Sequence, residues 1–383
     1  MRKHCAHVQS GLMKVALVHE LLTMKGGAEK VLRVLADMFP EAPIYTLLYD
    51  EKKLGDWFSK ERVRTSALQY RWLPAPFRYN HHLCLKKFPA TVETWDFSEF
   101  DLVISASSAF AHGIITNGKP RHLCYIHSPA RYLWDRTHDV LERAGRGVLG
   151  KLRRKYLERT FHKLRIWDSE AADRPDTLIA ASQEVQRRIE LYWRRQSDVI
   201  YPPIDDFWLQ SPVEQSPVGN YYLVVSTLVP YKRIDVAIEA CTQLKLPLKI
   251  AGTGPDERRL KSLAGPTVEL LGYVTDEELK ALYSGATATI FPGEEDFGLV
   301  PVESMACGTP VIALRKGGAL ETIVEGVTGT FFDELTAASL MNVLKDFSKA
   351  SFDTAACRAQ AEKFSHQKFE EQIRRAVENL TNA

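Results

Sequence analysis

Residues 288–313, ATIFPGEEDFGLVPVESMACGTPVIA, constrain the fold more than any other stretch of the chain. The first four residues are mostly apolar and β-prone, and the Pro292–Gly293 pair after them is typical of a turn. Pro301 suits the first turn of a helix, and Gly308 ends that helix after about two turns. An apolar strand follows at 311–313. The pattern predicts a strand, an acidic loop, a helix and a strand, and such loops bind ligands in open α/β sheets.

The loop and the helix of this stretch carry four carboxylates. They are Glu294, Glu295, Asp296 and Glu303. Backbone N–H groups at the helix start suit a phosphate or a row of hydroxyls, and neighbouring carboxylates suit sugar hydroxyls. The alternative is that the loop acids only complement the positive end of the helix. Glu303 needs another explanation, because an unpaired carboxylate in a largely apolar helix is costly to bury.

Length and composition set the broad class. A chain of 383 residues is too long for one ordinary core, so two domains are expected. The formal net charge of +2 gives no reason to expect a nucleic-acid partner. The six cysteines lack paired spacing, which fits a reducing compartment and no metal cluster. No apolar run approaches the roughly 18 residues that span a bilayer. The first twelve residues lack the apolar region of a secretory signal, and Met13 is a second candidate start.

The first half of the chain alternates buried strands with helices. Strands are predicted at 15–18, 102–105, 123–126 and 178–182. After the first strand, Gly26 and Gly27 open a helix expected to run to Met38, and they let backbone approach a ligand, although paired glycines more often only make a tight turn. His127 follows the third strand, at the sheet edge where ligands bind. For His19 and Glu20, a position in the cleft and a capping or core role are both open.

Two segments of the first half are strongly basic. Residues 60–88 carry seven Lys or Arg against the single acid Glu61, with aromatic residues between them. This composition suits an anionic membrane interface or single-stranded nucleic acid, and equally a solvated face with its aromatics turned inward. Residues 151–165 are predicted to form an amphipathic helix, whose apolar side faces either the core or a membrane.

The second half repeats the alternation after a linker rich in proline and glycine. Strands are predicted at 221–226, 248–251 and 268–271. Strands and helices alternating on both sides of the linker predict two doubly wound α/β units with parallel sheets. Lys232 follows the first of these strands, and it is either a cation for a nucleotide diphosphate or a solvated cation at a helix start.

Residues 295–303, EDFGLVPVE, resemble the Glu-x7-Glu signature of retaining glycosyltransferases of family 4. The resemblance implies the GT-B fold of the α/β class: two Rossmann-like, doubly wound parallel-sheet domains facing a central cleft. With the composition it implies an N-terminal extension at 1–12, an acceptor domain at 13–205 and a linker at 206–219. A donor-nucleotide domain at 220–356 and a C-terminal helix at 357–383, which crosses back to the first domain, would follow.

The resemblance also implies roles for individual residues. Glu295 would hold hexose hydroxyls, Glu303 the ribose hydroxyls, and Lys232 the departing diphosphate, which makes a metal or other cofactor unnecessary. His127 would contact the donor sugar. Further donor contacts are expected at Phe297, Gly298, Leu299, Thr227, Arg233, Gly252, Gly272, Tyr273 and Val274, and phosphate or acceptor contacts at Gly26, Gly27 and Arg131.

One position departs from the family pattern. That pattern is Arg-x4-Lys, with both cations on the diphosphate, and this chain has Thr227 where the arginine belongs. Losing one of two charge-assisted contacts to a leaving group would cost on the order of 2 to 4 kcal/mol of transition-state stabilisation. Arg233, next to Lys232, is the candidate for compensation.

Wording such as CYIHSPARYLWD at 124–135 and YLVVSTLVPYKRID at 222–235 is similar to mannosyltransferases that use GDP-mannose and build lipid-linked bacterial polysaccharide. The resemblance implies retaining, metal-independent hexosyl transfer to a polyprenyl-diphosphate-linked glycan. The protein would be cytoplasmic, with residues 60–88 on the inner face of the plasma membrane, and no nucleic acid is expected as a partner. A UDP-sugar-dependent transferase, a nucleotide-sugar epimerase and a weakly active nucleotide-sugar-binding protein are the alternatives.

Overall fold

The computed structural model describes residues 13–69, 84–210 and 219–382. The chain divides into two compact units. The first comprises Met1–Ala181, Val185–Ile200 and Ile373–Ala383, and the second comprises Ser182–Glu184 and Tyr201–Gln372.

The first unit is built on a seven-stranded sheet in the order β3-β2-β1-β4-β5-β6-β7, in which every neighbouring pair is parallel. The strands are β1 (Val15–Leu22), β2 (Ile44–Tyr49), β3 (Val63–Thr65), β4 (Leu102–Ser107), β5 (Arg121–Ile126), β6 (Thr177–Ala180) and β7 (Asp198–Val199). Nearly every residue of β1 and every residue of β4 is buried. Continuous burial of this kind is typical of parallel strands that are covered on both faces. The strand order reverses between β1 and β4, so the ends of these two strands are the switch point of the sheet.

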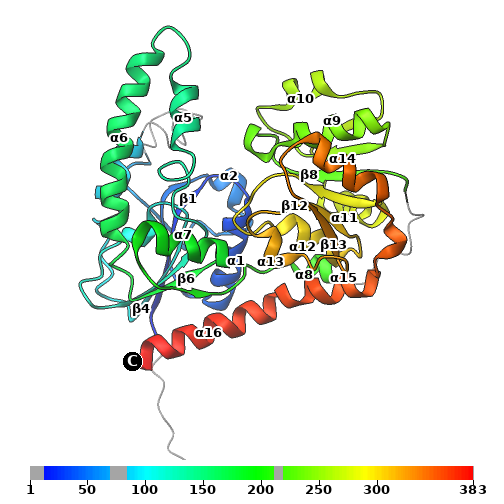
Figure 1. The fold of residues 1–383 in the computed structure, drawn as a ribbon. Helices are drawn as coiled ribbons and strands as arrows, with labels where there is room; N and C mark the ends of the chain where they lie inside the picture. Colours follow the sequence, from blue (N-terminus) through cyan, green and yellow to red (C-terminus); the bar gives the residue numbers. More distant parts are fainter. Residues whose placement is uncertain (1–12, 70–83, 211–218, 383) are drawn as a thin grey trace, which may run out of the picture. The chain divides into compact units, whose positions relative to one another are not determined.

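Helices cover this sheet (Figure 1). They are α1 (Gly27–Met38), α2 (Glu51–Leu54), α4 (Phe88–Val92), α5 (Thr137–Ala144), α6 (Gly150–Ala171) and α7 (Gln183–Trp193), with the 3-10 turns η2 (Leu85–Lys87) and η3 (Ala111–Gly113). The core on one side of the sheet is aromatic, and Phe88, Phe97 and Phe110 are buried in it. Helices α5 and α6 pack on each other as a hairpin.

The second unit has a six-stranded parallel sheet in the order β10-β9-β8-β11-β12-β13. Its strands are β8 (Tyr222–Val225), β9 (Leu248–Ala251), β10 (Val268–Gly272), β11 (Ala288–Phe291), β12 (Val311–Leu314) and β13 (Gly329–Phe332). Successive residues of a strand point to opposite faces. Accordingly Val224 and Leu223 belong to two different hydrophobic clusters. The sheet is therefore buried on both faces, and its order reverses between β8 and β11.

The helices of the second unit are α8 (Asp206–Leu209), α9 (Ile234–Leu244), α10 (Glu257–Leu263), α11 (Asp276–Gly285), α12 (Leu299–Ala306), α13 (Ala319–Thr322), α14 (Ala337–Asp346) and α15 (Thr354–Ala361), with the 3-10 turns η4 (Pro230–Lys232), η5 (Lys349–Ser351) and η6 (Glu362–Phe364). Helix α16 (His366–Asn382) begins in this unit, and its residues from Ile373 onward belong to the first. Helices α9 and α14 pack together and share one cluster, while α12 and α15 share the other.

The prediction of two doubly wound parallel sheets is confirmed, and the strands predicted in both halves are present. Strands β2, β3, β7 and β13 were not predicted, and β2 is buried at five of its six positions. The prediction of one continuous helix from residue 357 is wrong. Helix α15 begins at Thr354 and ends at Ala361, and Ser365 is extended before α16 begins. Phe364 lies at this break, where its buried ring packs against Phe297 with 5.4 Å between the ring centroids.

Candidate functional site

An ion pair lies at the switch point of the second sheet. Lys232 ends the turn η4 after β8, and Glu295 lies in the loop after the neighbouring strand β11. The ammonium group of Lys232 contacts Oε1 of Glu295, and the two side chains are 17% and 22% exposed. The crevice outside the carboxyl ends of such strands is where ligands bind in open α/β sheets. The two residues predicted to bear the diphosphate and the hexose are therefore in contact, in a partly accessible position.

Glycines hold the loop of Glu295 close to other backbone. A Cβ atom on Gly293 would lie 3.0 Å from the carbonyl oxygen of Lys232. On the other side, Gly317 has a φ of 62° and a Cβ there would lie 2.4 Å from the carbonyl oxygen of Glu295. The N–H of Gly318 donates to that same oxygen at 2.9 Å. The sequence shows the Gly317–Gly318 pair, but not that it packs against the acidic loop.

The start of α12 follows the same loop. Gly298 has φ 84° and ψ 95° and precedes the helix, and a Cβ on it would lie 2.8 Å from the ring of Phe291. The ring of Phe297 is buried and stacks on Tyr201, with centroids 5.6 Å apart. Leu299 is the first residue of α12. The structure thus places the backbone of 297–299 at the helix start, as the pattern predicted, and turns the Phe297 ring into the core.

Glu303 lies in α12 and is only 6% exposed. The hydroxyl of Tyr283, in α11, donates to its Oε2 at 3.2 Å. Burial and the nearby carboxylate raise the pKa of Tyr283 well above its ordinary value, so the phenol keeps its proton and serves as a donor. This hydrogen bond offsets part of the cost of burying Glu303. Tyr283, which was not singled out from the sequence, is thus a hydrogen-bond donor to the buried Glu303.

Thr227 and Arg233 are the two positions that bear on the missing arginine of the family pattern. Thr227 is exposed in the loop after β8. Arg233 adopts a left-handed backbone conformation with a φ of 52°, and its Nε lies 3.3 Å from Oδ1 of Asp235 in the first turn of α9. Nη2 of Arg259 also approaches this carboxylate, at 3.9 Å. The guanidinium of Arg233 is therefore engaged by Asp235.

The remaining predicted donor contacts lie at the ends of β9 and β10. Gly252 has a φ of 135°, and a Cβ on it would lie 1.9 Å from the carbonyl oxygen of Ser226. The backbone at Ser226 therefore leaves no room for a side chain at position 252. Gly272 has a φ of 75° with no heavy atom of the described residues within 4 Å of its Cβ position. Tyr273 is 81% exposed and Val274 is partly buried, at the end of the edge strand β10.

In the first unit, His127, which directly follows β5, is a neighbour of His19 within β1. Their ring centroids are 6.3 Å apart. Burial, with the nearby charge of His19, lowers the pKa of His127 to about 3. Burial also opposes charge on His19, but its contact with Glu29 and the charges of Glu20 and Glu29 outweigh burial and raise its pKa. At neutral pH the His127 ring is therefore neutral, and His19 holds a proton more readily than an ordinary histidine.

Glu20 is a buried capping residue. Its Oε1 accepts the hydroxyl of Ser107 at 2.7 Å and the backbone N–H groups of Ser108, Ala109, Phe110 and Ala111 at 2.8 to 3.1 Å. Burial raises the pKa of this carboxyl, but the charge of His19 and these donors outweigh it and lower the pKa to about 2. Of the two roles that the sequence left open for Glu20, the structure shows capping of the turn after β4.

The glycine loop and Arg131 are held by carboxylates. Gly26 precedes α1, and a Cβ on it would lie 2.6 Å from Oε2 of Glu29, which bends back over the helix start. Gly27 is the first residue of α1. Nε of Arg131 lies 3.6 Å from Oδ2 of Asp135. The structure thus places these predicted phosphate or acceptor residues in the first unit, with Gly26 beside Glu29 and Arg131 beside Asp135.

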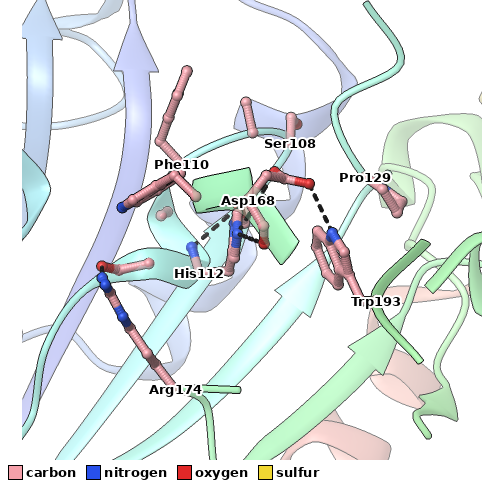
Figure 2. Close-up of polar contacts among 12 residues, drawn as sticks. Ser108, Phe110, His112, Pro129, Asp168, Arg174 and Trp193 are labelled. Carbon is pink, nitrogen blue, oxygen red and sulfur yellow. Dashed lines mark hydrogen bonds and ion pairs between the residues drawn. The ribbon is translucent and has the colours of Figure 1, made fainter. Parts of the chain in front are cut away.

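A buried polar network that the sequence analysis missed centres on Asp168 of α6 (Figure 2). Its Oδ2 accepts the indole N–H of Trp193 at 2.7 Å and that of Trp134 at 2.9 Å. Nε2 of His112 lies 3.3 Å from the Asp168 carbonyl oxygen, and Nδ1 of the same ring lies 3.3 Å from the Ser107 hydroxyl. Burial raises the pKa of Asp168 and lowers that of His112. The network joins α6 and α7 to the turn that Glu20 caps.

The basic and aromatic segment 60–88 is only partly described. Residues 70–83 of it, including most of the aromatic residues, lie outside the described residues. Arg62 donates to backbone carbonyls of Ala36, Phe39 and Ala42, and Phe88 is buried. These two side chains serve the fold of the first unit.

Two searches of the described residues bear on partners. Among residues 13–69, 84–210 and 219–382, no group of three or more His, Cys, Asp or Glu side chains is placed to hold a metal ion. None of the helices in the same ranges combines the length and the apolar character that crossing a membrane requires.

Solved structures with the same arrangement define the fold class. The chain superposes on a sucrose-phosphate synthase from Thermosynechococcus elongatus with a TM-score of 0.72 and 18% identity, covering 96% of this chain and 99% of that one. It superposes on the HepE protein from Anabaena, solved in complex with UDP, with a TM-score of 0.68 and 19% identity, covering 95% and 100%. With its sheets of seven and six parallel strands, the chain has the GT-B α/β fold, and that predicted fold class is confirmed.

Sequence comparison then identifies the part of the chain that contains the Lys232–Glu295 pair. Residues 208–364 match the family described as "Glycosyl transferases group 1". An uncharacterized glycosyltransferase from Methanocaldococcus jannaschii is 27% identical over 42% of this chain and 46% of that protein. The human alpha-1,3/1,6-mannosyltransferase is 30% identical over 48% and 52%. The O-antigen chain mannosyltransferase B from Escherichia coli is 30% identical over 42% and 48%. These matches span about half the length of each of these relatives.

Proposed function

We propose that the protein is a retaining glycosyltransferase that moves a hexose from a nucleotide sugar to a glycan acceptor. The observation that carries the proposal is the contact between Lys232 and Glu295 at the switch point of the second sheet. This pair lies in the segment that matches the group 1 glycosyl transferases. A cation and a carboxylate at a ligand-binding edge match the two halves of a nucleotide sugar, a charged diphosphate and a row of hydroxyls.

The proposed mechanism begins with an exchange of partners. Without a donor, the ammonium group of Lys232 is neutralised by Glu295. A bound diphosphate carries more negative charge than a carboxylate, and it replaces Glu295 as the ion-pair partner of Lys232. The carboxylate of Glu295 is then released to accept hydrogen bonds from the hexose hydroxyls. Lys232 stabilises the charge that develops on the leaving diphosphate, and that phosphate takes the acceptor proton in a same-face displacement.

GDP-mannose is the proposed donor. Several relatives are named as mannosyltransferases, including one from Mycolicibacterium smegmatis named as GDP-mannose-dependent, which is 32% identical over 35% of this chain and 40% of that protein. The Anabaena neighbour, by contrast, is described in complex with UDP. The acceptor we propose is a glycan on a polyprenyl diphosphate, reached from the cytoplasmic face of the membrane.

A thermal-shift panel tests the donor, because a ligand that binds only the folded state raises the unfolding temperature by mass action. GDP and GDP-mannose are expected to raise it more than UDP, UDP-glucose and the adenine nucleotides. A selective shift with UDP compounds would overturn the GDP assignment and leave the transferase class intact. Product analysis with donor alone separates a transferase from an epimerase, which would change the sugar without any acceptor.

A specific observation favours a second candidate, a weakly active nucleotide-sugar-binding protein. Thr227 stands at the position of the expected arginine, and Asp235 engages Arg233. On this reading the donor binds, and transfer is slow with every acceptor. Steady transfer by the unaltered protein to a lipid-linked glycan would exclude it.

A further inference from the structure

The hairpin of α5 and α6 carries a surface that the proposed reaction does not use. Residues 151–159 of α6 include no buried residue, but Leu157 is partly buried and packs against the core of the first unit. The six residues before it, 151–156, are all exposed, and at 1.5 Å per residue they extend the helix by about 9 Å. We name residues 143–163 the hairpin tip, and Figure 1 shows its loop at the end of the two helices.

The hairpin tip is strongly cationic. It contains eight exposed Lys and Arg residues and one acid, Glu158, which pairs with Arg154 at 2.8 Å. The basic residues are Arg143, Arg146, Lys151, Arg153, Arg154, Lys155, Arg159 and Lys163. The first turn of α6 has no acidic residue, so Lys151 and Arg153 oppose the helix dipole. Helix stability therefore does not explain Lys151 and Arg153.

The same tip exposes large apolar side chains. Val148 is fully exposed in the loop, and Leu149 and Leu152 are each 70% exposed. Tyr156 follows Leu152 by four residues, on the same face of the helix. Single exposed apolar residues are ordinary on a protein surface, but a contiguous set at a projecting tip marks a contact with another apolar phase.

A hollow of about 700 Å³ opens beside this face. It is lined by Lys86, Leu152, Lys155, Tyr156, Arg159, Thr160, Lys163 and Leu164. The ammonium group of Lys86 lies 3.8 Å from the centroid of the Tyr156 ring. Four cations around an open hollow, next to exposed leucines, match phosphate headgroups above acyl chains.

We propose that the hairpin tip docks the protein on an anionic phospholipid membrane. Val148 and Leu149 enter the headgroup region, and the surrounding Lys and Arg side chains face lipid phosphates. Single-stranded nucleic acid fits less well, because its binding relies on successive aromatic rings, and among the described residues that line the hollow only Tyr156 is aromatic. Lys86, which belongs to the basic segment 60–88, lines this docking surface, and the docking does not depend on the proposed transfer reaction.

Vesicle flotation with the full chain tests the docking. The protein is expected to float with phosphatidylcholine vesicles that contain phosphatidylglycerol, to float much less at high salt, and to remain unbound with phosphatidylcholine alone. Equal binding to both vesicle types, or no binding to the anionic ones, would overturn the proposal. So would binding to a single-stranded oligonucleotide in preference to anionic vesicles. Because flotation needs no sugar transfer, its failure is distinct from failure of the proposed enzyme.

Paired variants locate the surface. Val148→Asp/Leu149→Asp and Lys151→Glu/Lys155→Glu are each expected to lower the partition onto anionic vesicles at least tenfold. Matched controls make the same changes at exposed residues elsewhere, as Leu191→Asp/Leu263→Asp and Lys345→Glu/Lys368→Glu. Controls that bind as the unaltered protein does, beside weakened tip variants, support the hairpin tip. Tip variants that bind like their controls would refute it, provided that all of them keep the thermal unfolding midpoint of the unaltered protein.

Discussion

The ammonium group of Lys232 contacts the carboxylate of Glu295, although the two residues follow different strands, β8 and β11, of one sheet. Each neutralises the other where a nucleotide sugar would bind. In the proposed mechanism this contact breaks when the donor binds, and Lys232 and Glu295 each take a new partner on the nucleotide sugar.

Lys232→Ala removes the proposed diphosphate contact. If the group acts on charge that develops on the leaving phosphate, kcat/KM for sugar transfer is expected to fall about 100- to 1000-fold. The measurement is transfer kinetics with GDP-mannose and a lipid-linked acceptor, with Lys345→Ala, an exposed lysine of the same unit, as the control. A loss below threefold would contradict the assignment.

Thr227→Arg restores the arginine of the family pattern. The added cation lies in the loop after β8 and is expected to raise kcat about tenfold or more, because one contact to a leaving group contributes roughly 2 to 4 kcal/mol. Thr227→Gln adds length without charge and serves as the control. If the unaltered enzyme is already fast and the arginine changes nothing, the threonine is not a defect.

Tyr283→Phe leaves the buried carboxylate of Glu303 without the donor that now reaches its Oε2. The free energy of unfolding is expected to fall by about 1.5 to 3 kcal/mol, the typical contribution of a hydrogen bond to a charged group. Urea unfolding measures it. The control is Tyr273→Phe, which removes a hydroxyl from a side chain that is 81% exposed and should change stability by less than about 0.5 kcal/mol.

Glu20 makes stability depend on acid pH. Its pKa is lowered from 4.5 to about 2 in the folded protein, so its contribution is fully present above pH 4.5. The contribution is lost as the pH falls from 4.5 towards 2. Glu20→Gln is expected to cost about 3 kcal/mol at neutral pH, and the gap to the unaltered protein should narrow over that window. Unfolding measured from pH 7 to pH 2.5 shows it, and a constant gap would contradict the lowered pKa.

Gly298→Ala tests the loop geometry at the start of α12. An alanine at this position would have to keep a backbone φ of 84°, and its methyl group would lie 2.8 Å from the ring of Phe291. Gly326→Ala is a matched control, because its φ is 74° with no described heavy atom within 4 Å. Both should lose about 1 kcal/mol for the left-handed backbone, and Gly298→Ala is expected to lose 1 to 3 kcal/mol more from the clash. Equal losses would mean that the ring moves aside freely.

Local patterns made the sheets and the acidic loop predictable. Apolar runs between turn residues located β8, β9, β11 and β12, and the Pro301 and Gly308 positions bounded α12 to within a few residues. These signals are local, because strand burial and helix ends are determined largely by residues adjacent in the sequence.

The polar partners were not predictable in the same way. The donors to Glu20 come from a turn about 90 residues later, and Asp168 gathers its indole donors from segments on both sides of it. Tyr283 lies 20 residues before Glu303 on a different helix. No periodicity in the sequence encodes such long-range pairs, so a buried acid could be flagged as needing a partner, but the partner itself could not be named.

The close packing of glycines around the acidic loop limits how that loop can respond to a ligand. A Cβ on Gly317 would lie 2.4 Å from the carbonyl oxygen of Glu295, and one on Gly293 would lie 3.0 Å from that of Lys232. The segment that carries Glu295 is thus packed closely against two other stretches of main chain. We therefore expect Glu295 to leave Lys232 by rotation of its side chain, with little movement of the backbone beneath it.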